Sequence, residues 1–328
     1  MFCDKTDTFG RRFLLRSELG FGKEMWKMVY KLTPSLHDNI WGGNRLRKYG
    51  KKSDADRIAE SWELSFVFGN EAKIEDGRSL SEAFSREDWG DNCRGFEFFP
   101  TLTKFIDARD KLSVQVHPSD EYALSNEGQY GKTEMWYVVD AEPGAGLYMG
   151  LSREVSKEEF ASRVKDGTVE QILSFREVKP ADVFFIPAGT VHAIGAGVLI
   201  YEIQQNSTLT YRLYDYMRVD KDGKLRELHV DKALDVCDLS VYRPTRFGED
   251  EIIGKCKYFE VERMEVSGKA YVGVTKDSYV ALSVVSGSGS CDGTPATAGD
   301  SFFAPASNGE ISLEGNMTVL VVRTPKQQ

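Results

Sequence analysis

Polar and apolar residues alternate with a period of two over residues 112–118, which is the pattern of a half-buried strand. Gln115 and His117 then project from one face of the predicted sheet, because side chains two apart on a strand point the same way. Val114 and Val116 are expected to pack behind them. This spacing predicts an amide oxygen and an imidazole nitrogen that reach one common point.

Two further segments predict strands that carry ligand-type side chains. Residues 132–139 are rich in aromatic and β-branched residues and lead into the turn-forming residues 140–144. Glu134 lies near the start of this strand, where a buried carboxylate would be costly unless it is paired or bound to a metal. Residues 183–192 predict an apolar strand, a Pro/Gly turn, and then His192 at the start of the next strand.

Each of these side chains alone is weak support for a metal site, since a histidine in a strand is more often a core or surface residue. Together, two imidazoles, a carboxylate and an amide oxygen suit a divalent ion such as zinc, with room left for water or substrate. The predicted metal ligands are Gln115, His117, Glu134 and His192.

The chain also contains an internal repeat. Residues 181–192 align with residues 299–310, and Gly197 then falls on Gly315 without a gap, which implies two copies of one unit. In the second copy Glu310 stands where the first has its ligand histidine. We therefore expect the C-terminal copy to be a structural partner that binds no metal.

Helical segments are expected between and around the strands. Residues 156–159 and 168–171 match the capping box, and each is followed by apolar residues at helical spacing. Residues 81–87 and 230–236 predict further helices. Most other segments are short, turn-bounded strands, with residues 279–285 among them, which favours an all-β barrel or sandwich core carrying helical insertions.

Length, charge and cysteine usage narrow the class of protein. At 328 residues the chain exceeds a usual single domain, so two cores are expected. A formal charge of -9 and a pI near 5.2 argue against a nucleic acid or an anionic membrane as partner. The 5 cysteines are scattered without CxxC spacing, which fits reduced thiols in a cytoplasm. The N-terminal segment, residues 1–24, has no signal-peptide pattern, and we expect translation to start at Met25 or Met28.

These motifs resemble a known family. The run Pro-Ala-Gly-Thr-Val-His at residues 187–192 matches the second motif of the cupin superfamily, and the paired copies match a bicupin. A closer resemblance is to the short bacterial form of class I mannose-6-phosphate isomerase, strongest over residues 31–238 and general beyond. The motifs that carry it are WGG at 41–43, SWE at 61–63, SVQVHP at 113–118, GKTE at 131–134, HAIG at 192–195, EIQQ at 202–205 and YRLYDY at 211–216.

The resemblance implies an architecture of two jelly-roll β-barrels, with helical insertions in the N-terminal half. We expect an N-terminal extension over residues 1–27 and a catalytic cupin domain over residues 28–240. Residues 241–328 are then a smaller, degenerate cupin domain without metal. A monomer or a homodimer is expected.

The same resemblance implies an activity, which is the zinc-dependent interconversion of mannose 6-phosphate and fructose 6-phosphate through a cis-enediol. One zinc ion per chain is expected, acting as a Lewis acid on the sugar oxygens. The four predicted ligands fall on the zinc-ligand positions of the family, with Gln115 held more loosely than the other three. Arg212 falls on the position of the catalytic arginine.

The chemistry of the isomerisation explains why such residues are needed. Moving a proton between adjacent carbons passes through an anionic enediolate, so it needs a fixed cation and a base. Arg212 supplies a permanent charge. Glu202, on the strand after His192, is our candidate base, with a residue in a salt bridge at the barrel rim as the alternative. Lys132 shares a strand face with Glu134 and is predicted to contact phosphate or sugar oxygens; a solvated lysine is the alternative.

Two other classes of protein stay open at this point. A cupin with two histidines and one carboxylate can be an iron(II) oxygenase that uses a facial triad. Arg212 and Lys132 favour a phosphorylated, oxygen-rich substrate instead. The second class is a sugar-sensing or structural bicupin without turnover, which the intact ligand set argues against.

Overall fold

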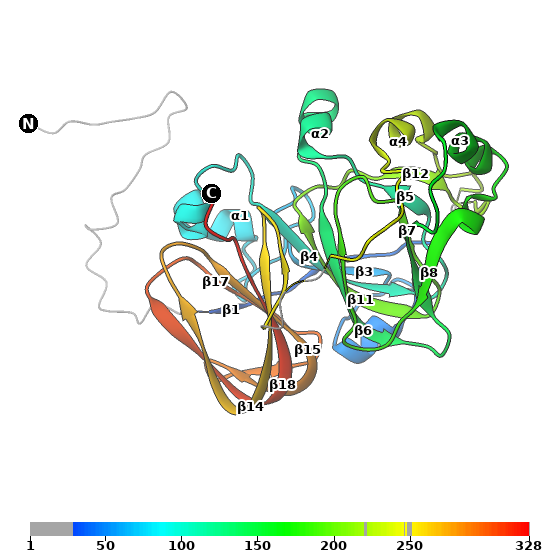
Figure 1. The fold of residues 1–328 in the computed structure, drawn as a ribbon. Coiled ribbons are helices and arrows are strands. Elements are labelled where there is room, and N and C mark those ends of the chain that lie inside the picture. The colour runs from blue at the N-terminus through cyan, green and yellow to red at the C-terminus, as the bar shows by residue number, and fades with distance from the viewer. Residues whose placement is uncertain (1–28, 220–221, 246, 248–250, 328) are drawn as a thin grey trace, which may run out of the picture.

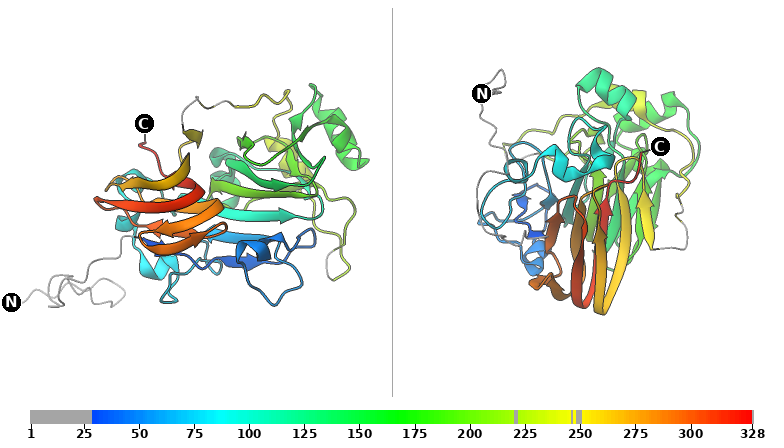
Figure 2. Two further views of the ribbon diagram at one scale, coloured as in Figure 1. Left: turned by 90° about the horizontal axis from the view of Figure 1, so that it is seen from below. Right: turned by 90° about the vertical axis from the view of Figure 1, so that its left-hand side faces the viewer.

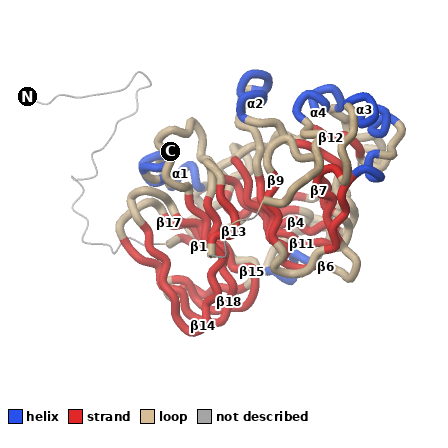
Figure 3. The backbone as a smooth tube through the Cα atoms, in the orientation of Figure 1, coloured by secondary structure: helices blue, strands red, loops and turns tan. Residues whose placement is uncertain are grey.

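The computed structural model describes residues 29–219, 222–245, 247 and 251–327. Strands are the main regular secondary structure in this part of the chain, in agreement with the mostly β fold that the sequence predicts (Figure 3). Met25 and Met28, the expected translation starts, lie outside the described residues. None of the described helices has the length and apolar character that crossing a membrane requires.

Two sheets form the N-terminal half (Figure 1). The six-stranded sheet contains, in spatial order, β2 (Ser35–His37), β3 (Glu60–Leu64), β4 (Thr101–Ala108), β11 (Val198–Gln205), β6 (Glu134–Ala141) and β9 (Val183–Ile186). The five-stranded sheet contains β12 (Tyr211–Tyr214), β5 (Val114–Val116), β10 (His192–Ile194), β7 (Gly146–Leu151) and β8 (Leu173–Glu177). Strand pairs within both sheets are antiparallel.

A third, seven-stranded sheet forms most of the C-terminal half. Its main path is β1 (Tyr30–Lys31), β17 (Ser301–Ala304), β15 (Val280–Cys291), β18 (Gly309–Arg323), β14 (Glu260–Val274) and β13 (Ile252–Lys255), and β16 (Thr294–Thr297) pairs with β15. The first described strand, β1, therefore joins the C-terminal sheet through antiparallel pairing with β17. Figure 2 shows the two halves side by side.

Helices are short and gather mainly at one end of the N-terminal half (Figure 1). The α-helices are α1 (Leu80–Ala83), α2 (Asp120–Glu127), α3 (Lys157–Lys165) and α4 (Val230–Val236). The 3-10 helices are η1 (Arg45–Tyr49), η2 (Arg86–Trp89), η3 (Asp91–Cys93) and η4 (Val169–Ile172). Helix α3 begins where its capping box predicts, since Ser156 Oγ accepts from the Glu159 N–H at 3.2 Å.

Two predicted helices differ in detail from the sequence expectation. The segment 168–171 forms the 3-10 helix η4, and the Thr168 side chain makes no capping hydrogen bond. The segment 81–87 is divided, because α1 ends at Ala83 and Ser85 begins the separate turn η2. The second difference arises because Ser85 starts a new turn, in which its N–H and its hydroxyl both donate to Asp88 Oδ2.

Apolar clusters fix the sheets around the interior of the N-terminal half. Phe160 and Val164 of α3 and Ala233 of α4 pack on the outer face of the five-stranded sheet. The outer face of the six-stranded sheet meets the C-terminal half, where Phe105 and Tyr201 share a cluster with residues such as Tyr279 and Phe303. Because each fully buried side chain of this size contributes about 1.5–3 kcal/mol, these contacts hold the two halves together.

Candidate metal centre

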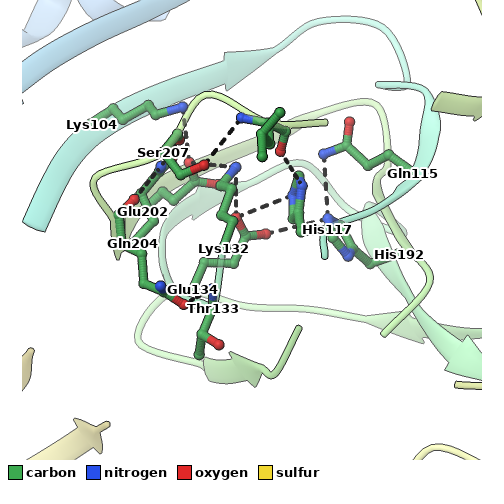
Figure 4. Close-up of polar contacts among 12 residues, drawn as sticks. Lys104, Gln115, His117, Lys132, Thr133, Glu134, His192, Glu202, Gln204 and Ser207 are labelled. Atoms are coloured by element: carbon green, nitrogen blue, oxygen red, sulfur yellow. Dashed lines mark hydrogen bonds and ion pairs between the residues drawn. The ribbon is translucent and has the colours of Figure 1, made fainter. Parts of the chain in front are cut away.

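Neighbouring strands place three of the predicted metal ligands on one face of the five-stranded sheet. His192 is the first residue of β10 and lies opposite Gln115 of β5 in the register. Residues directly opposite in an antiparallel pair share a face. His117 follows β5 directly, two residues beyond Gln115, and so returns to that face. Glu134 begins β6 in the six-stranded sheet and meets these side chains from the other wall (Figure 4).

Side-chain atoms of His117, Glu134 and His192 converge on one point. Glu134 Oε2 lies 3.5 Å from His117 Nε2, and Glu134 Oε1 lies 3.3 Å from His192 Nε2. Ligand atoms of all three lie within 4.8 Å of one another. Atoms bound to a tetrahedral zinc ion at about 2.0–2.1 Å are separated by about 3.3 Å. The spacing of these donors therefore fits zinc.

Backbone carbonyls orient both imidazoles. His117 Nδ1–H donates to the Leu209 carbonyl and His192 Nδ1–H donates to the Thr190 carbonyl, each at 2.8 Å. These contacts leave the Nε2 lone pairs directed toward Glu134. His117 Nε2 and Glu134 Oε1 are buried without a hydrogen-bond partner. A cation is the species that would satisfy two lone pairs and a carboxylate at one buried point, and carbonyl-oriented imidazoles are typical of metal sites.

Burial sets the protonation of this cluster. Desolvation lowers the pKa of His192 to about 4 and holds the pKa of His117 well below its ordinary value. Both imidazoles are therefore neutral near pH 7, which is the form that binds metals. Burial raises the pKa of Glu134 to about 7, and the charge of Glu202 adds to this rise while Lys132 opposes it. A bound cation would favour the ionised carboxylate.

Gln115 lies beside this cluster with its amide nitrogen nearest to it. Its Nε2–H donates to His192 Nε2 at 3.3 Å, and its Oε1 accepts from Ser113 Oγ at 3.3 Å. The predicted ligand atom, the amide oxygen, faces away from His192 in this arrangement. Rotating the amide by a half-turn exchanges the two atoms. Ligation by Gln115 therefore stays a prediction.

A row of buried charges continues from Glu134 across the six-stranded sheet (Figure 4). Lys132 Nζ lies 2.8 Å from Glu134 Oε2 and 3.7 Å from Glu202 Oε1. Lys104 Nζ lies 3.1 Å from the same Glu202 oxygen, and the Trp136 N–H donates to the other at 2.8 Å. Lys132 is thus not the solvated lysine of the sequence alternative, since its side chain is buried.

These partners determine the acidity of Glu202, the candidate base. Burial alone would raise its pKa, but the Lys104 and Lys132 ammonium groups and the Trp136 N–H lower it to about 2. A carboxylate with such a low pKa has little affinity for a proton. Its contacts favour the alternative interpretation, an ion-paired residue, and its use as base stays a prediction.

Arg212 lies on the next strand beyond Gln115. It is opposite Gln115 in the β12–β5 register, so both side chains start from one face of the sheet. Its Nη1 donates to the Glu227 carbonyl at 2.9 Å, and its buried Nε has no hydrogen-bond partner. Two further arginines gather nearby, because Arg218 and Arg226 both pair with Asp215. This end of the site carries concentrated positive charge.

The sequence interpretation missed several residues that shape this site. Lys104 is buried in the middle of β4, and a lysine within a strand that is buried throughout was the available signal. Trp136 lies against His192 with ring centroids 5.3 Å apart. Arg218 is three residues from its partner Asp215, whereas Arg226 reaches the same carboxylate from 11 residues away and carried no spacing signal.

Comparisons with known proteins match both halves of this chain. Residues 29–146 match the model of the phosphomannose isomerase type I catalytic domain, and residues 250–324 match that of the mannose-6-phosphate isomerase cupin domain. Mannose-6-phosphate isomerase ManA of Bacillus subtilis is 36% identical over 306 residues, which cover 88% of this chain and 96% of that protein. The chain belongs to the mannose-6-phosphate isomerase family. A family member from Streptococcus mutans is 37% identical over 274 residues, covering 79% of this chain and 85% of its own.

Solved structures of the family share the fold. The crystal structure of the mannose 6-phosphate isomerase from Bacillus subtilis matches with a TM-score of 0.82 and 31% identity, covering 90% of this chain and 99% of that one. A structure described as mannose 6-phosphate isomerase in its zinc-bound holo form matches with a TM-score of 0.73. It is 16% identical and covers 91% of this chain and 100% of its own, so it supports the fold alone.

Proposed function

We propose that this protein interconverts mannose 6-phosphate and fructose 6-phosphate by zinc-assisted proton transfer through a cis-enediol. The single observation that carries the proposal is the convergence of two neutral imidazoles and one carboxylate within 4.8 Å. Membership of the isomerase family supports the reaction and its sugar phosphate substrate. The two imidazoles and the carboxylate are donors that zinc prefers, which supports the choice of metal.

We assign the metal to His117, Glu134 and His192, with one ion per chain and Gln115 as a fourth, looser ligand. Zinc held there would supply a Lewis acid that polarises the sugar oxygens. The carbonyl contacts at both Nδ1 atoms keep the imidazoles oriented before any ligand arrives, which lowers the cost of assembling the site.

Positive side chains would stabilise the negative charge that develops during the reaction. Arg212 is the proposed catalytic cation, since its guanidinium stays protonated and can bind two oxygens at once. Lys132 is proposed to contact the sugar phosphate, with its position fixed by Glu134 and Glu202. Arg218 and Arg226, which share Asp215, add positive charge near Arg212.

The proton-transfer base can be tested through Glu202. Glu202→Gln keeps an oxygen that accepts from the Trp136 N–H but leaves Lys104 and Lys132 without their shared counter-charge. Because unpaired buried charges are costly, we expect a lower melting temperature and a slower reaction that still exchanges substrate hydrogen with solvent. Complete loss of that exchange at unchanged melting temperature would instead identify Glu202 as the base.

We further propose that residues 28–240 and 241–328 are two cupin domains of a bicupin, preceded by an extension over residues 1–27. The helices between β7 and β8 would then be insertions in the first cupin. The aligned repeat and the cupin match at residues 250–324 support this division. A cytoplasmic location is consistent with the free thiols of Cys93, Cys237 and Cys256.

One experiment tests the proposed function. Purified protein, loaded with zinc and analysed for metal, is incubated with mannose 6-phosphate while fructose 6-phosphate is measured. Removal of the metal by a chelator should abolish the product, and added zinc should restore it. His37→Ala is a matched control for metal content, because it deletes an imidazole that does not belong to the converging set.

Two results would favour the other classes of protein. Oxygen uptake with iron, together with no isomerase activity on the zinc-loaded protein, would support an oxygenase. Tight binding of sugar phosphate without exchange of substrate hydrogen into solvent would support a sensor. Product formation that depends on zinc would exclude both interpretations.

A further inference from the structure

One tyrosine of the C-terminal half reaches toward the candidate metal centre. Tyr258 lies between β13 and β14 and is only 4% exposed. Its hydroxyl donates a hydrogen bond to Asp120 Oδ2. Its ring packs on Tyr130, with centroids 5.8 Å apart, and on Phe96, with centroids 5.2 Å apart. Tyr258 therefore contacts the segment that leads into Glu134 both directly and through Asp120.

Asp120 connects this tyrosine to the backbone beside Glu134. The other carboxylate oxygen, Oδ1, accepts from the Gly131 N–H at 3.0 Å and from Gln205 Nε2 at 2.9 Å. Gln205 Oε1 in turn accepts from the Thr133 N–H at 2.7 Å. Two of the three amide groups that precede Glu134 are thus held by one network, in which Tyr258 is the outermost member.

The same network fastens the segments that carry His117 and Glu134 to each other. The Lys132 N–H donates to the Pro118 carbonyl at 3.0 Å, directly after His117. A Cβ atom on Gly131 would lie 2.5 Å from that same carbonyl oxygen, so the two backbones approach as closely as glycine permits. A shift of residues 131–134 would therefore move Lys132 and Glu134 relative to His117.

We propose that Tyr258 is a positioning residue for the isomerisation, through which the C-terminal half fixes Asp120 and hence the Lys132–Glu134 segment. The inference rests on the proposed function, because it assumes that Lys132 and Glu134 act on the sugar phosphate. A hydrogen bond to an ionised carboxylate is among the stronger ones in proteins, and catalytic groups tolerate little displacement. The C-terminal half then contributes to catalysis without supplying a ligand.

The matched pair Tyr258→Phe and Tyr201→Phe tests the proposal. Both tyrosines are buried and both hydroxyls bond across the boundary between the two halves, but the Tyr201 hydroxyl bonds to Thr103 Oγ1 at 2.7 Å and to Ser283 Oγ at 2.5 Å, not to Asp120. In zinc-saturated protein we expect Tyr258→Phe to lower kcat by about tenfold, with KM changed less than twofold, since one charge-assisted hydrogen bond is lost. Tyr201→Phe should leave kcat within twofold of wild type, even where it lowers the melting temperature.

Hydrogen exchange gives a readout that does not depend on activity. Tyr258→Phe should speed exchange of the amides of Gly131 and Thr133, whereas Tyr201→Phe should not. In an Asp120→Ala background, adding Tyr258→Phe should change kcat less than twofold, because the tyrosine acts through that carboxylate. Equal effects of the two tyrosine variants on kcat, or unchanged exchange at residues 131–134, would overturn the proposal.

Failure of the proposed function gives a different pattern. If the wild-type protein makes no fructose 6-phosphate, the proposed function is wrong. The amide hydrogen exchange would still report whether Tyr258 holds residues 131–134 in place. An active wild-type enzyme with unchanged kcat in Tyr258→Phe would remove only the positioning role.

Discussion

The turn after Ala181 in the N-terminal half and the turn after Gly299 in the C-terminal half make the same hydrogen bonds to a neighbouring strand. The Ala181 N–H donates to the Val138 carbonyl at 2.8 Å. The Gly299 N–H donates to the Val284 carbonyl, also at 2.8 Å. In both copies the next residue, an aspartate, accepts from the same strand residue at 2.9 Å, and both turns begin at a positive φ. The aligned sequences thus build one local backbone twice.

The side chains at corresponding positions differ in kind. Counting back from the shared hydrogen bonds, Glu134 at the start of β6 corresponds to Val280 at the start of β15. Val280 is buried in an apolar cluster of the C-terminal half. His192 is fully buried beside Glu134, whereas its aligned partner Glu310 is exposed. This turn is therefore stable without any metal ligand, and the chemistry depends on a few side chains added to it.

Replacing His192 by alanine should give the largest effect, because it makes the first copy resemble the second. We expect loss of bound zinc and a fall in kcat/KM of about a thousandfold or more, since a metal ion supplies several kcal/mol of transition-state stabilisation. Metal analysis and steady-state kinetics on the same preparation test this. Wild-type zinc content in the variant would remove His192 from the ligand set.

Arg212→Ala should lower activity while leaving the metal in place. The guanidinium lies opposite Gln115 on the neighbouring strand and is not among the converging donors. We expect kcat to fall by about a hundredfold or more, which is the usual cost of removing one donor to a developing oxyanion. Zinc content should equal that of wild type, and Arg212→Lys should restore only part of the rate. An unchanged kcat would exclude the arginine from the mechanism.

Local periodicity accounts for the parts of the fold and site that the sequence could predict. The strands that carry Gln115, Glu134 and His192 have alternating or apolar patterns, and the structure forms strands at all three. Helix α2 escaped prediction because Ala123 is its only buried residue, so no apolar stripe marks it.

Residues that act through distant partners could not be predicted from the sequence. Lys104 meets Glu202 only through the register of β4 with β11. Tyr258 meets Asp120 across the boundary between the two halves. No short spacing encodes either pair, because tertiary packing alone brings the partners together.

A pH-dependent stability should distinguish the two copies in metal-free protein. Burial lowers the pKa of His192 to about 4, whereas an unfolded histidine titrates near 6.5. Between about pH 4 and pH 6.5 the unfolded chain binds more protons than the folded chain. The contribution of neutral His192 to stability, which is fully present above about pH 6.5, is therefore lost as the pH falls. From pH 7 to pH 5 we expect this group to lower the free energy of unfolding by about 2 kcal/mol. Urea unfolding with chelator, in wild type and His192→Gln, measures the difference. If the free energy of unfolding changed equally with pH in the two proteins, His192 would not be the buried neutral imidazole that we infer.

The smallest effect is expected for Glu310→Gln in the second copy. Glu310 is exposed and lies opposite Gly273 in the β14–β18 register, so its charge is solvated and no buried partner depends on it. We expect kcat within twofold of wild type and a stability change within about 0.5 kcal/mol, as for most surface substitutions. A specific loss of kcat at unchanged melting temperature would mean that this turn itself helps to form the site. If kcat holds here but falls in Tyr258→Phe, the C-terminal half acts through its contact with Asp120 and not through the position that aligns with His192.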